Sequence, residues 1–278
     1  MKVSQASSTK ELERIARKIR FRTIRNSHLT GTPHLGSCLS CTDLLVWLYW
    51  NILKLDSRDP NAPARDRFIL SKGHAAPVLF QVLAERGFYP MTDLQSYGND
   101  GSIFGEHPPS PEHLSGIEAA TGSLGHGLPM GLGMALAGRL QKSSYNVYVI
   151  LSDGECNEGS VWEAVMAAPH FKLDNLIAII DRNSYQQTGA GPDIMNSGDL
   201  RQKFSNFGWH AVDINGHDTS DIYMALNQYT GSKPKAIIAK TIKGKGFSFS
   251  EGNNAWHHAV LTEKLYNLGL IECEEMSK

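Results

Sequence analysis

Two polar residues follow the two predicted strands of one β-α-β unit. Asp153 comes soon after the apolar run 147–151, and Asn183 soon after the run 176–180. Helical spacing between the runs predicts parallel strands joined by a right-handed crossover. Asp153 and Asn183 would then share the carboxyl-end edge of the sheet, where open α/β sheets bind ligands. Carboxylate and amide oxygens there suit a hard cation such as Mg²⁺ that bridges to a phosphate. The alternative is that both residues only cap turns.

Histidines form a second group of candidate functional residues. Four of them stand in loops or at strand ends beside Gly or Pro: His34, His74, His107 and His257. Loops that follow the strands of an open sheet converge on one crevice. Imidazoles gathered there would move protons and hydrogen-bond phosphate or sugar hydroxyls. Taken singly, each is more often a packing or surface residue, so the prediction depends on their shared type of position.

The glycine-rich segment 122–140 is expected to be a helix, and its glycines do not form a nucleotide-binding fingerprint. Met130 stands where the third glycine of G-x-G-x-x-G would fall after Gly125 and Gly127, and the chain has no P-loop motif. The glycines would instead permit close approach of the backbone to a ligand, or a helix N-terminus that faces an anion.

Cys38 and Cys41 form a lone C-x-x-C pair, which could be a redox pair or half of a zinc site. No second C-x-x-C or H-x-x-x-H follows to complete four zinc ligands. Two reduced thiols packed in the core are the favoured interpretation.

Composition argues against several classes of protein. The 278 residues carry 27 Lys and Arg against 28 Asp and Glu, so nothing global points to nucleic acid or a membrane surface. The first residues lead into a charged segment, which argues against a secretory signal, and no apolar run approaches the ~20 residues of a membrane span. A basic amphipathic helix over 10–25 could lie on an anionic surface, but a solvated helix at a domain edge is favoured. Four cysteines fit a reduced, cytoplasmic setting.

The remaining elements predict the fold class. Further strands are expected at 67–70, 211–214 and 236–239, and further helices at 42–53, 75–86, 200–207 and 220–229. The irregular segments 87–121 and 184–200 are long enough to be functional loops. Without a repeat or a low-complexity linker, the pattern favours a single domain over residues 1–278. Its sheet would be doubly wound, mostly parallel and flanked by helices.

Several motifs, in one order along residues 15–260, resemble the thiamine-diphosphate-binding N-terminal half of transketolase. The resemblance is strongest to the separate N-terminal subunit of split transketolases. Asp153-Gly154 followed by Asn183 is similar to the cofactor signature G-D-G…N. The other matching segments are R-D-R-F-I-L-S-K-G-H-A at 65–75, T-G-S-L-G-H-G at 121–127, T-P-H-L-G at 32–36, and F-G-W with N-G-H-D at 207–218.

This resemblance implies a thiamine-diphosphate-binding (PP-type) domain that holds thiamine diphosphate and Mg²⁺, with Ca²⁺ or Mn²⁺ as substitutes. The metal ligands would be Asp153, Asn183 and the backbone carbonyl of Tyr185. The cofactor-binding residues would be His74, Gly122, Ser123, Leu124, Gly125, Asp153, Gly154, Glu163 and Asn183. The catalytic set would be His34, His107, His257 and Glu158. The three histidines would handle the substrate's hydroxyl protons, whereas Glu158 and Glu163 match interface glutamates that link cofactor sites across a dimer.

The implied reaction transfers a two-carbon ketol unit from a ketose to an aldose, with sugars or sugar phosphates as substrates. In this family the groups that activate the cofactor's aminopyrimidine lie in a following pyrimidine domain, which these residues do not include. We therefore expect a C-terminal partner subunit in an α2β2 assembly, and a chain that is inactive alone. The alternatives are a subunit of another thiamine-diphosphate enzyme, of the ketosynthase or 2-oxoacid dehydrogenase type, or a non-catalytic subunit that retains the fold.

Five positions depart from the family pattern. Ser152 replaces a glycine, His126 replaces a glutamine, and Thr32-Pro33 replace Ser-Gly. Glu106 precedes His107 where the family usually has glycine. We predict that this carboxylate raises the pKa of His107 or reshapes the acceptor end of the pocket.

Overall fold

The computed structural model describes residues 7–275, and its centre is a five-stranded parallel sheet. The strands are β1 (Arg67–Leu70), β2 (Val147–Ser152), β3 (Leu176–Arg182), β4 (His210–Asn215) and β5 (Lys235–Lys240). They lie in the order β1-β2-β3-β5-β4, and every neighbouring pair is parallel. Because sequence order and sheet order differ, the chain must cross over between strands. The predicted doubly wound α/β fold is confirmed.

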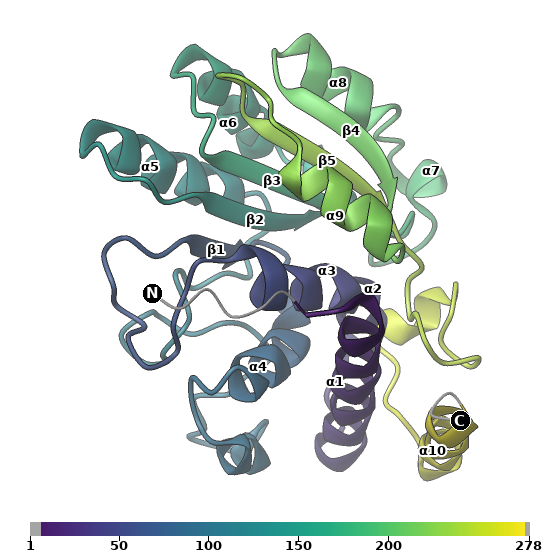
Figure 1. Ribbon diagram of the computed structural model, residues 1–278. Coiled ribbons are helices and arrows are strands. Elements are labelled where there is room, and N and C mark those ends of the chain that lie inside the picture. Colours follow the sequence, from purple (N-terminus) through teal and green to yellow (C-terminus); the bar gives the residue numbers. More distant parts are fainter. Residues whose placement is uncertain (1–6, 276–278) are drawn as a thin grey trace.

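Helices cover both faces of this sheet (Figure 1). Their bounds are α1 (Thr9–Thr30), α2 (Leu35–Ser40), α3 (Thr42–Trp47), α4 (Ala76–Glu85), α5 (Gly127–Leu140), α6 (Gly159–His170), α7 (Gly191–Ile194), α8 (Leu200–Asn206), α9 (Thr219–Asn227) and α10 (Glu263–Glu275). Successive side chains of a strand point to opposite faces. Ile150 and Ile179 accordingly pack with α3, α4 and α9, whereas Val149 and Ala178 pack with α5, α6 and α8.

The central strands β2 and β3 place the candidate ligands. Every residue of β2 is buried, as are the first six of β3, which explains why both read as continuous apolar runs. The register pairs Ser152 with Asp181, so both strands end at the same level. Asp153 and Asn183 therefore emerge side by side at the carboxyl-end edge of the sheet.

Several predicted elements were wrong in their bounds. The segment 122–140 is helical only from Gly127, because Gly125 has φ 85° and cannot continue a right-handed helix. The predicted helix 42–53 divides into α3 and a π-helix, Leu48–Ile52. The predicted loop 184–200 contains the short helix α7.

The C-x-x-C pair is buried, as the favoured interpretation predicted. Cys38 and Cys41 are free thiols almost without exposure, and burial raises the pKa of each to about 12. Thiols held in this protonated state are poor nucleophiles and poor metal ligands. Over residues 7–275, no helix has both the length and the apolar character needed to cross a membrane.

Candidate active site

Asp153 and Asn183 meet at the edge of the sheet through a tight turn. The Oδ2 atom of Asp153 accepts a hydrogen bond from the backbone N–H of Ser184, at 2.9 Å. Ser184 has φ 66°, a left-handed conformation that folds the chain back directly after Asn183. Both Asp153 and Asn183 are buried, and Asn183 Oδ1 accepts a hydrogen bond from the N–H of Tyr185 at 3.1 Å. The structure thus brings the Asp153 carboxylate against the turn that contains Asn183 and Tyr185.

The Asp153 carboxylate suits a divalent cation. Burial and the nearby carboxylate of Asp181 raise the pKa of Asp153 to about 6. Within the described residues its hydrogen bonds come from the backbone N–H groups of Gly154 and Ser184, and no ion pair compensates its charge. A cation at this carboxylate would remove the desolvation penalty. No cluster of three His, Cys, Asp or Glu side chains suited to a metal occurs in residues 7–275, so a cation here would depend on amide and backbone oxygens as well.

A buried ion pair forms the floor beneath this edge. Lys72 Nζ lies 2.5 Å from Asp181 Oδ2, and both side chains are fully buried. Burial alone would lower the pKa of Lys72, but Asp181 outweighs that effect and holds the pKa above its usual range. Asp181 also accepts hydrogen bonds from Ser40 and Thr241. The pair therefore fixes the ends of β1 and β3 relative to α2 and the segment after β5.

Glu155 connects the ends of β1 and β2 to the glycine loop, residues 122–125, and was not among the predicted site residues. Its fully buried carboxylate accepts hydrogen bonds from the hydroxyl of Ser71, the N–H of Gly125 at 2.8 Å and the N–H of Ser152 at 3.2 Å. Burial raises its pKa, although these three donors oppose the shift. A carboxylate two residues beyond a strand-end aspartate was the available signal. Glu155 is a positioning residue, since it holds the loop in place.

The four predicted histidines lie together above that floor. The ring of His34 lies 5.4 Å from the ring of His74, 6.4 Å from that of His107 and 5.1 Å from that of His257, between centroids. The backbone N–H of His34 donates to the carbonyl of His257 at 3.0 Å, and His34 has φ 68°. His74 Nε2 lies 3.1 Å from Ser37 Oγ. The prediction that these four histidines lie close together is confirmed.

Burial keeps most of this cluster uncharged at neutral pH. It lowers the pKa values of His34 and His74, and lowers that of His257 to about 3. A neutral imidazole has one nitrogen that donates and one that accepts. These histidines can therefore hold substrate hydroxyls in defined orientations.

Two further residues beside the cluster were not predicted. Lys243 is buried, its Nζ donates to Asn254 Oδ1 at 2.6 Å, and burial lowers its pKa to about 8. His258 is exposed, and its ring lies 4.7 Å from the ring of His257. The position of Lys243 shortly after β5 was the signal for the lysine. For His258 the signal was its place directly after a histidine that was itself a candidate.

The glycine loop, Glu158 and Glu163 differ in how closely they approach the histidine cluster. A Cβ on Gly122 would lie 2.9 Å from His107 Cδ2, so the loop that carries Gly122, Ser123, Leu124 and Gly125 passes against that histidine. Glu158 lies against Gly125, whose Cβ would be 2.7 Å from that of Glu158. Glu163 is exposed on α6, and no contact among residues 7–275 joins it to the histidines.

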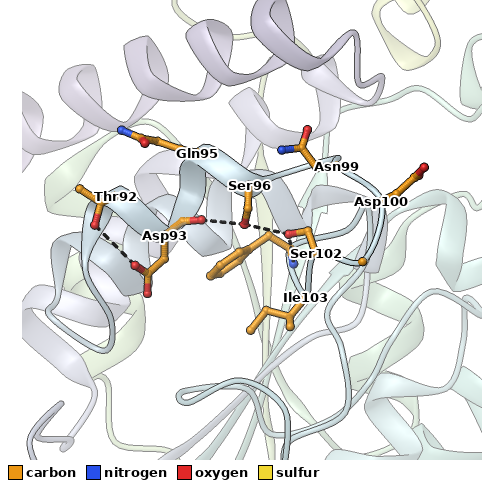
Figure 2. Close-up of a pocket in the computed structure, with 10 residues that line it drawn as sticks. Thr92, Asp93, Gln95, Ser96, Asn99, Asp100, Ser102 and Ile103 are labelled. Carbon is orange, nitrogen blue, oxygen red and sulfur yellow. Dashed lines mark hydrogen bonds between the residues drawn. The ribbon is translucent and has the colours of Figure 1, made fainter.

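A separate depression lies in the loop 92–104 and lacks comparable chemistry. It encloses about 690 Å³ and is lined by Thr92, Asp93, Gln95, Ser96, Asn99, Asp100, Gly101, Ser102, Ile103 and Phe104 (Figure 2). Ser96 and Ser102 are hydrogen-bonded to each other at 3.0 Å, so their hydroxyls stabilise the loop itself. The histidine cluster and the Asp153 edge remain the candidate active site.

Comparison with known proteins decides the family. Residues 12–267 match the model described as transketolase, thiamine diphosphate binding domain. The chain belongs to the transketolase family. The fold class and the resemblance predicted from the sequence are both confirmed.

Two similar transketolase relatives have nearly the same length as this chain. It is 40% identical over 266 residues to a subunit of the apulose-4-phosphate transketolase of Phocaeicola vulgatus, covering 95% of this chain and 94% of that protein. It is 39% identical over 267 residues to the 6-deoxy-6-sulfo-D-fructose transketolase subunit SqwG of Clostridium sp.. That match covers 95% of this chain and 97% of SqwG.

Longer transketolases contain this chain as one part. Human transketolase is 40% identical over 256 residues, which are 91% of this chain but 40% of that protein. The crystal structure of transketolase from Campylobacter jejuni superposes on this chain with a TM-score of 0.90 at 30% sequence identity. The superposition covers 96% of this chain and 43% of the Campylobacter chain. The chain thus spans less than half the length of these transketolases and corresponds to their thiamine-diphosphate-binding domain.

Proposed function

We propose that this chain is the N-terminal, thiamine-diphosphate-binding subunit of a split transketolase. The enzyme would transfer a two-carbon ketol unit from a ketose to an aldose, so that a C–C bond of the donor breaks and a new C–C bond to the acceptor forms. The observation that carries the proposal is that two relatives named as transketolase subunits match it over 94% and 97% of their length. The site supports it, because an oxygen-ligand edge adjoins a cluster of neutral histidines.

Thiamine diphosphate, when bound, stabilises the carbanion that this reaction requires. Asp153, the side chain of Asn183 and the backbone carbonyl of Tyr185 would hold its Mg²⁺, for which Ca²⁺ or Mn²⁺ could substitute. The residues that would bind the cofactor are His74, Gly122, Ser123, Leu124, Gly125, Asp153, Gly154, Glu163 and Asn183. The raised pKa of Asp153 supports this assignment, since a cation would relieve the buried charge.

His34, His107 and His257 would bind the substrate and move its hydroxyl protons. The rings of His107 and His257 both lie near that of His34, and burial keeps His34 and His257 neutral, so that each of these two rings has one nitrogen that donates and one that accepts. Glu158 stands at the start of α6 beside the glycine loop, and Glu163 is exposed on the same helix. Both would face a second copy of the chain, as the family resemblance implies.

The proposal includes a partner. A single domain over residues 1–278 would bind the diphosphate end of the cofactor, and a C-terminal subunit would provide the pyrimidine domain in an α2β2 assembly. Sugars or sugar phosphates would be the substrates, in the cytoplasm. The need for a second chain is supported by the relatives of matching length, because each is named as one subunit of a transketolase.

Cofactor binding provides the first test. Thiamine diphosphate with Mg²⁺ should raise the Tm of the purified chain, because a ligand at 100 times its Kd stabilises a protein by about 2.7 kcal/mol. Asp153→Ala should abolish that shift, whereas Asp59→Ala, at an exposed aspartate, should keep it. An unchanged Tm in the parent chain would contradict cofactor binding by this chain alone.

Activity provides the second test. The chain mixed with its C-terminal subunit should form a new ketose from a ketose donor and an aldose acceptor, and neither chain should do so separately. Robust ketol transfer by this chain alone would overturn the split assignment.

A further inference from the structure

Glu106 places a carboxylate at the mouth of the histidine cluster. Its Oε2 lies 3.9 Å from Nε2 of His34, and its side chain is 47% exposed whereas that of His34 is 13% exposed. Glu106 therefore lies on the solvent side of the histidine. This solvent side of His34 is the mouth of the cluster.

No cation neutralises this carboxylate within residues 7–275. Glu106 makes no ion pair with Lys or Arg there, and its one charged-group contact is His34, which burial keeps largely neutral by lowering its pKa. Neither lysine near the cluster pairs with Glu106. Lys72 pairs with Asp181, and Lys243 donates to Asn254 and lies 3.4 Å from Nδ1 of His257. The charge that Glu106 places beside His34 therefore stays unpaired in the described residues.

The other groups at this mouth are polar. The exposed ring of His258 lies 5.8 Å from the ring of His34, and its Nε2 lies 3.0 Å from Nε2 of Gln187. His34 Nδ1 is buried without a hydrogen-bond partner in the described structure. These groups suit hydroxyls, which both donate and accept hydrogen bonds.

We infer that Glu106 makes this site select uncharged, hydroxyl-bearing acceptor aldehydes and discriminate against anionic ones. A carboxylate can accept a hydrogen bond from an acceptor hydroxyl, whereas it repels a phosphate or sulfonate that passes the same mouth. This inference rests on the proposed ketol transfer and names the acceptor class for it. Repulsion across ~10 Å of aqueous solvent corresponds to roughly a fivefold effect on affinity for a doubly charged group.

The test compares two acceptors that share one carbon chain, D-glyceraldehyde and D-glyceraldehyde 3-phosphate. The enzyme is the complex of this chain with its C-terminal subunit, and kcat/KM is measured for each acceptor at low salt. Glu106→Gln should raise kcat/KM for the phosphorylated acceptor about fivefold and change that for D-glyceraldehyde less than twofold. Glu112→Gln removes the same charge from an exposed glutamate that is bonded to Ser110, so it should change neither value.

Ionic strength separates charge repulsion by Glu106 from a structural effect of its replacement. The gain in kcat/KM for the phosphorylated acceptor in Glu106→Gln should shrink at about 0.5 M salt, where the Debye length falls below ~5 Å. An unchanged acceptor ratio in Glu106→Gln, or a gain that does not depend on salt, would overturn the inference while ketol transfer to D-glyceraldehyde still supports the proposed function. Absence of transfer to both acceptors in the parent complex would instead overturn the proposed function, and the inference with it.

Discussion

Lys72 and Asp181 form a completely buried ion pair, 2.5 Å apart, beneath the edge of the sheet where the candidate ligands lie. Asp181 belongs to β3, and Lys72 follows β1, so the pair joins strands that are separated in the sheet by β2. The same aspartate carboxylate raises the pKa of Asp153. The charge balance of this floor therefore influences both the stability of the fold and the protonation of Asp153.

Removing only the cation of this pair should be strongly destabilising. We expect Lys72→Met to lower the free energy of unfolding by about 3–5 kcal/mol, because it leaves Asp181 buried with an uncompensated charge. Urea denaturation measures the change. The double variant Lys72→Met/Asp181→Asn should recover a large part of it, since Asn keeps an acceptor without the charge. Arg58→Met, which breaks an exposed pair with Asp56, should leave the midpoint of urea denaturation unchanged. If Lys72→Met changed that midpoint no more than Arg58→Met does, the expectation would be refuted.

Glu155→Gln should weaken cofactor binding more than it weakens the fold. The glutamine retains one acceptor oxygen but directs an NH₂ group toward one of the backbone donors, Gly125 or Ser152. Leaving that donor unsatisfied costs about 1–3 kcal/mol and frees the glycine loop. Calorimetric titration with thiamine diphosphate and Mg²⁺ should show a Kd roughly tenfold higher than in the parent chain. Equal Kd values in the two proteins would show that Glu155 does not position the loop.

Two glycines at the glycine loop and α5 should respond oppositely to alanine. Gly125 has φ 85°, and a Cβ there would lie 2.6 Å from Ser160 Oγ, so Gly125→Ala should destabilise the chain by about 1–3 kcal/mol. Gly133 lies within α5 with no atom within 4 Å of its Cβ position, so Gly133→Ala should stabilise by about 0.5–1 kcal/mol. Thermal unfolding of the two variants should shift Tm in opposite directions. A Gly125→Ala protein as stable as Gly133→Ala would contradict the strained loop conformation.

His257 should make the fold less stable as the solution becomes acidic. Its pKa falls from 6.5 to about 3 on folding, mainly through burial and then through the charge of Lys243. Between pH 6.5 and about 3 the unfolded chain therefore binds a proton that the folded chain does not, so the free energy of unfolding falls with falling pH. Above pH 6.5 both states are neutral and the contribution is constant.

Urea denaturation at about pH 7 and about pH 5 tests this dependence. His257→Asn should reduce the loss of stability between the two pH values, whereas His113→Asn, at an exposed histidine, should retain it. An identical pH dependence in the parent chain and in His257→Asn would show that the histidine is not held neutral by the fold.

Periodicity predicted the sheet well because its strands are buried on both faces. The run 147–151 became β2 with one residue added, and Arg67–Leu70 matched β1. Glycine was harder to interpret from sequence. The predicted helix included segment 122–126, and the left-handed φ of Gly125 and its contact with Ser160 explain why that segment forms a loop. Such contacts arise from residues distant in sequence, so a local pattern cannot report them.

The candidate site was predictable where chemistry follows a strand end. Asp153, Asn183 and His74 stood out because each comes shortly after an apolar run. Glu155 did not, since its role depends on donors from Ser71 and Gly125 that only the fold brings near. Motif order identified the family, but the orientation of Glu106 toward His34 rather than toward its neighbour His107 required the structure.

The hydrogen bond from the His34 N–H to the His257 carbonyl joins an early part of the chain to a late one. A ribosome releases the N-terminal residues long before it adds the later ones, so a growing chain has the first histidine without its acceptor. Until residue 257 has left the exit tunnel, the left-handed backbone at His34 lacks this support and the pocket stays open on one side. Synthesis therefore completes the histidine cluster only after the whole sheet has been made, and a product terminated before residue 257 would carry Asp153 and Asn183 without that finished cluster.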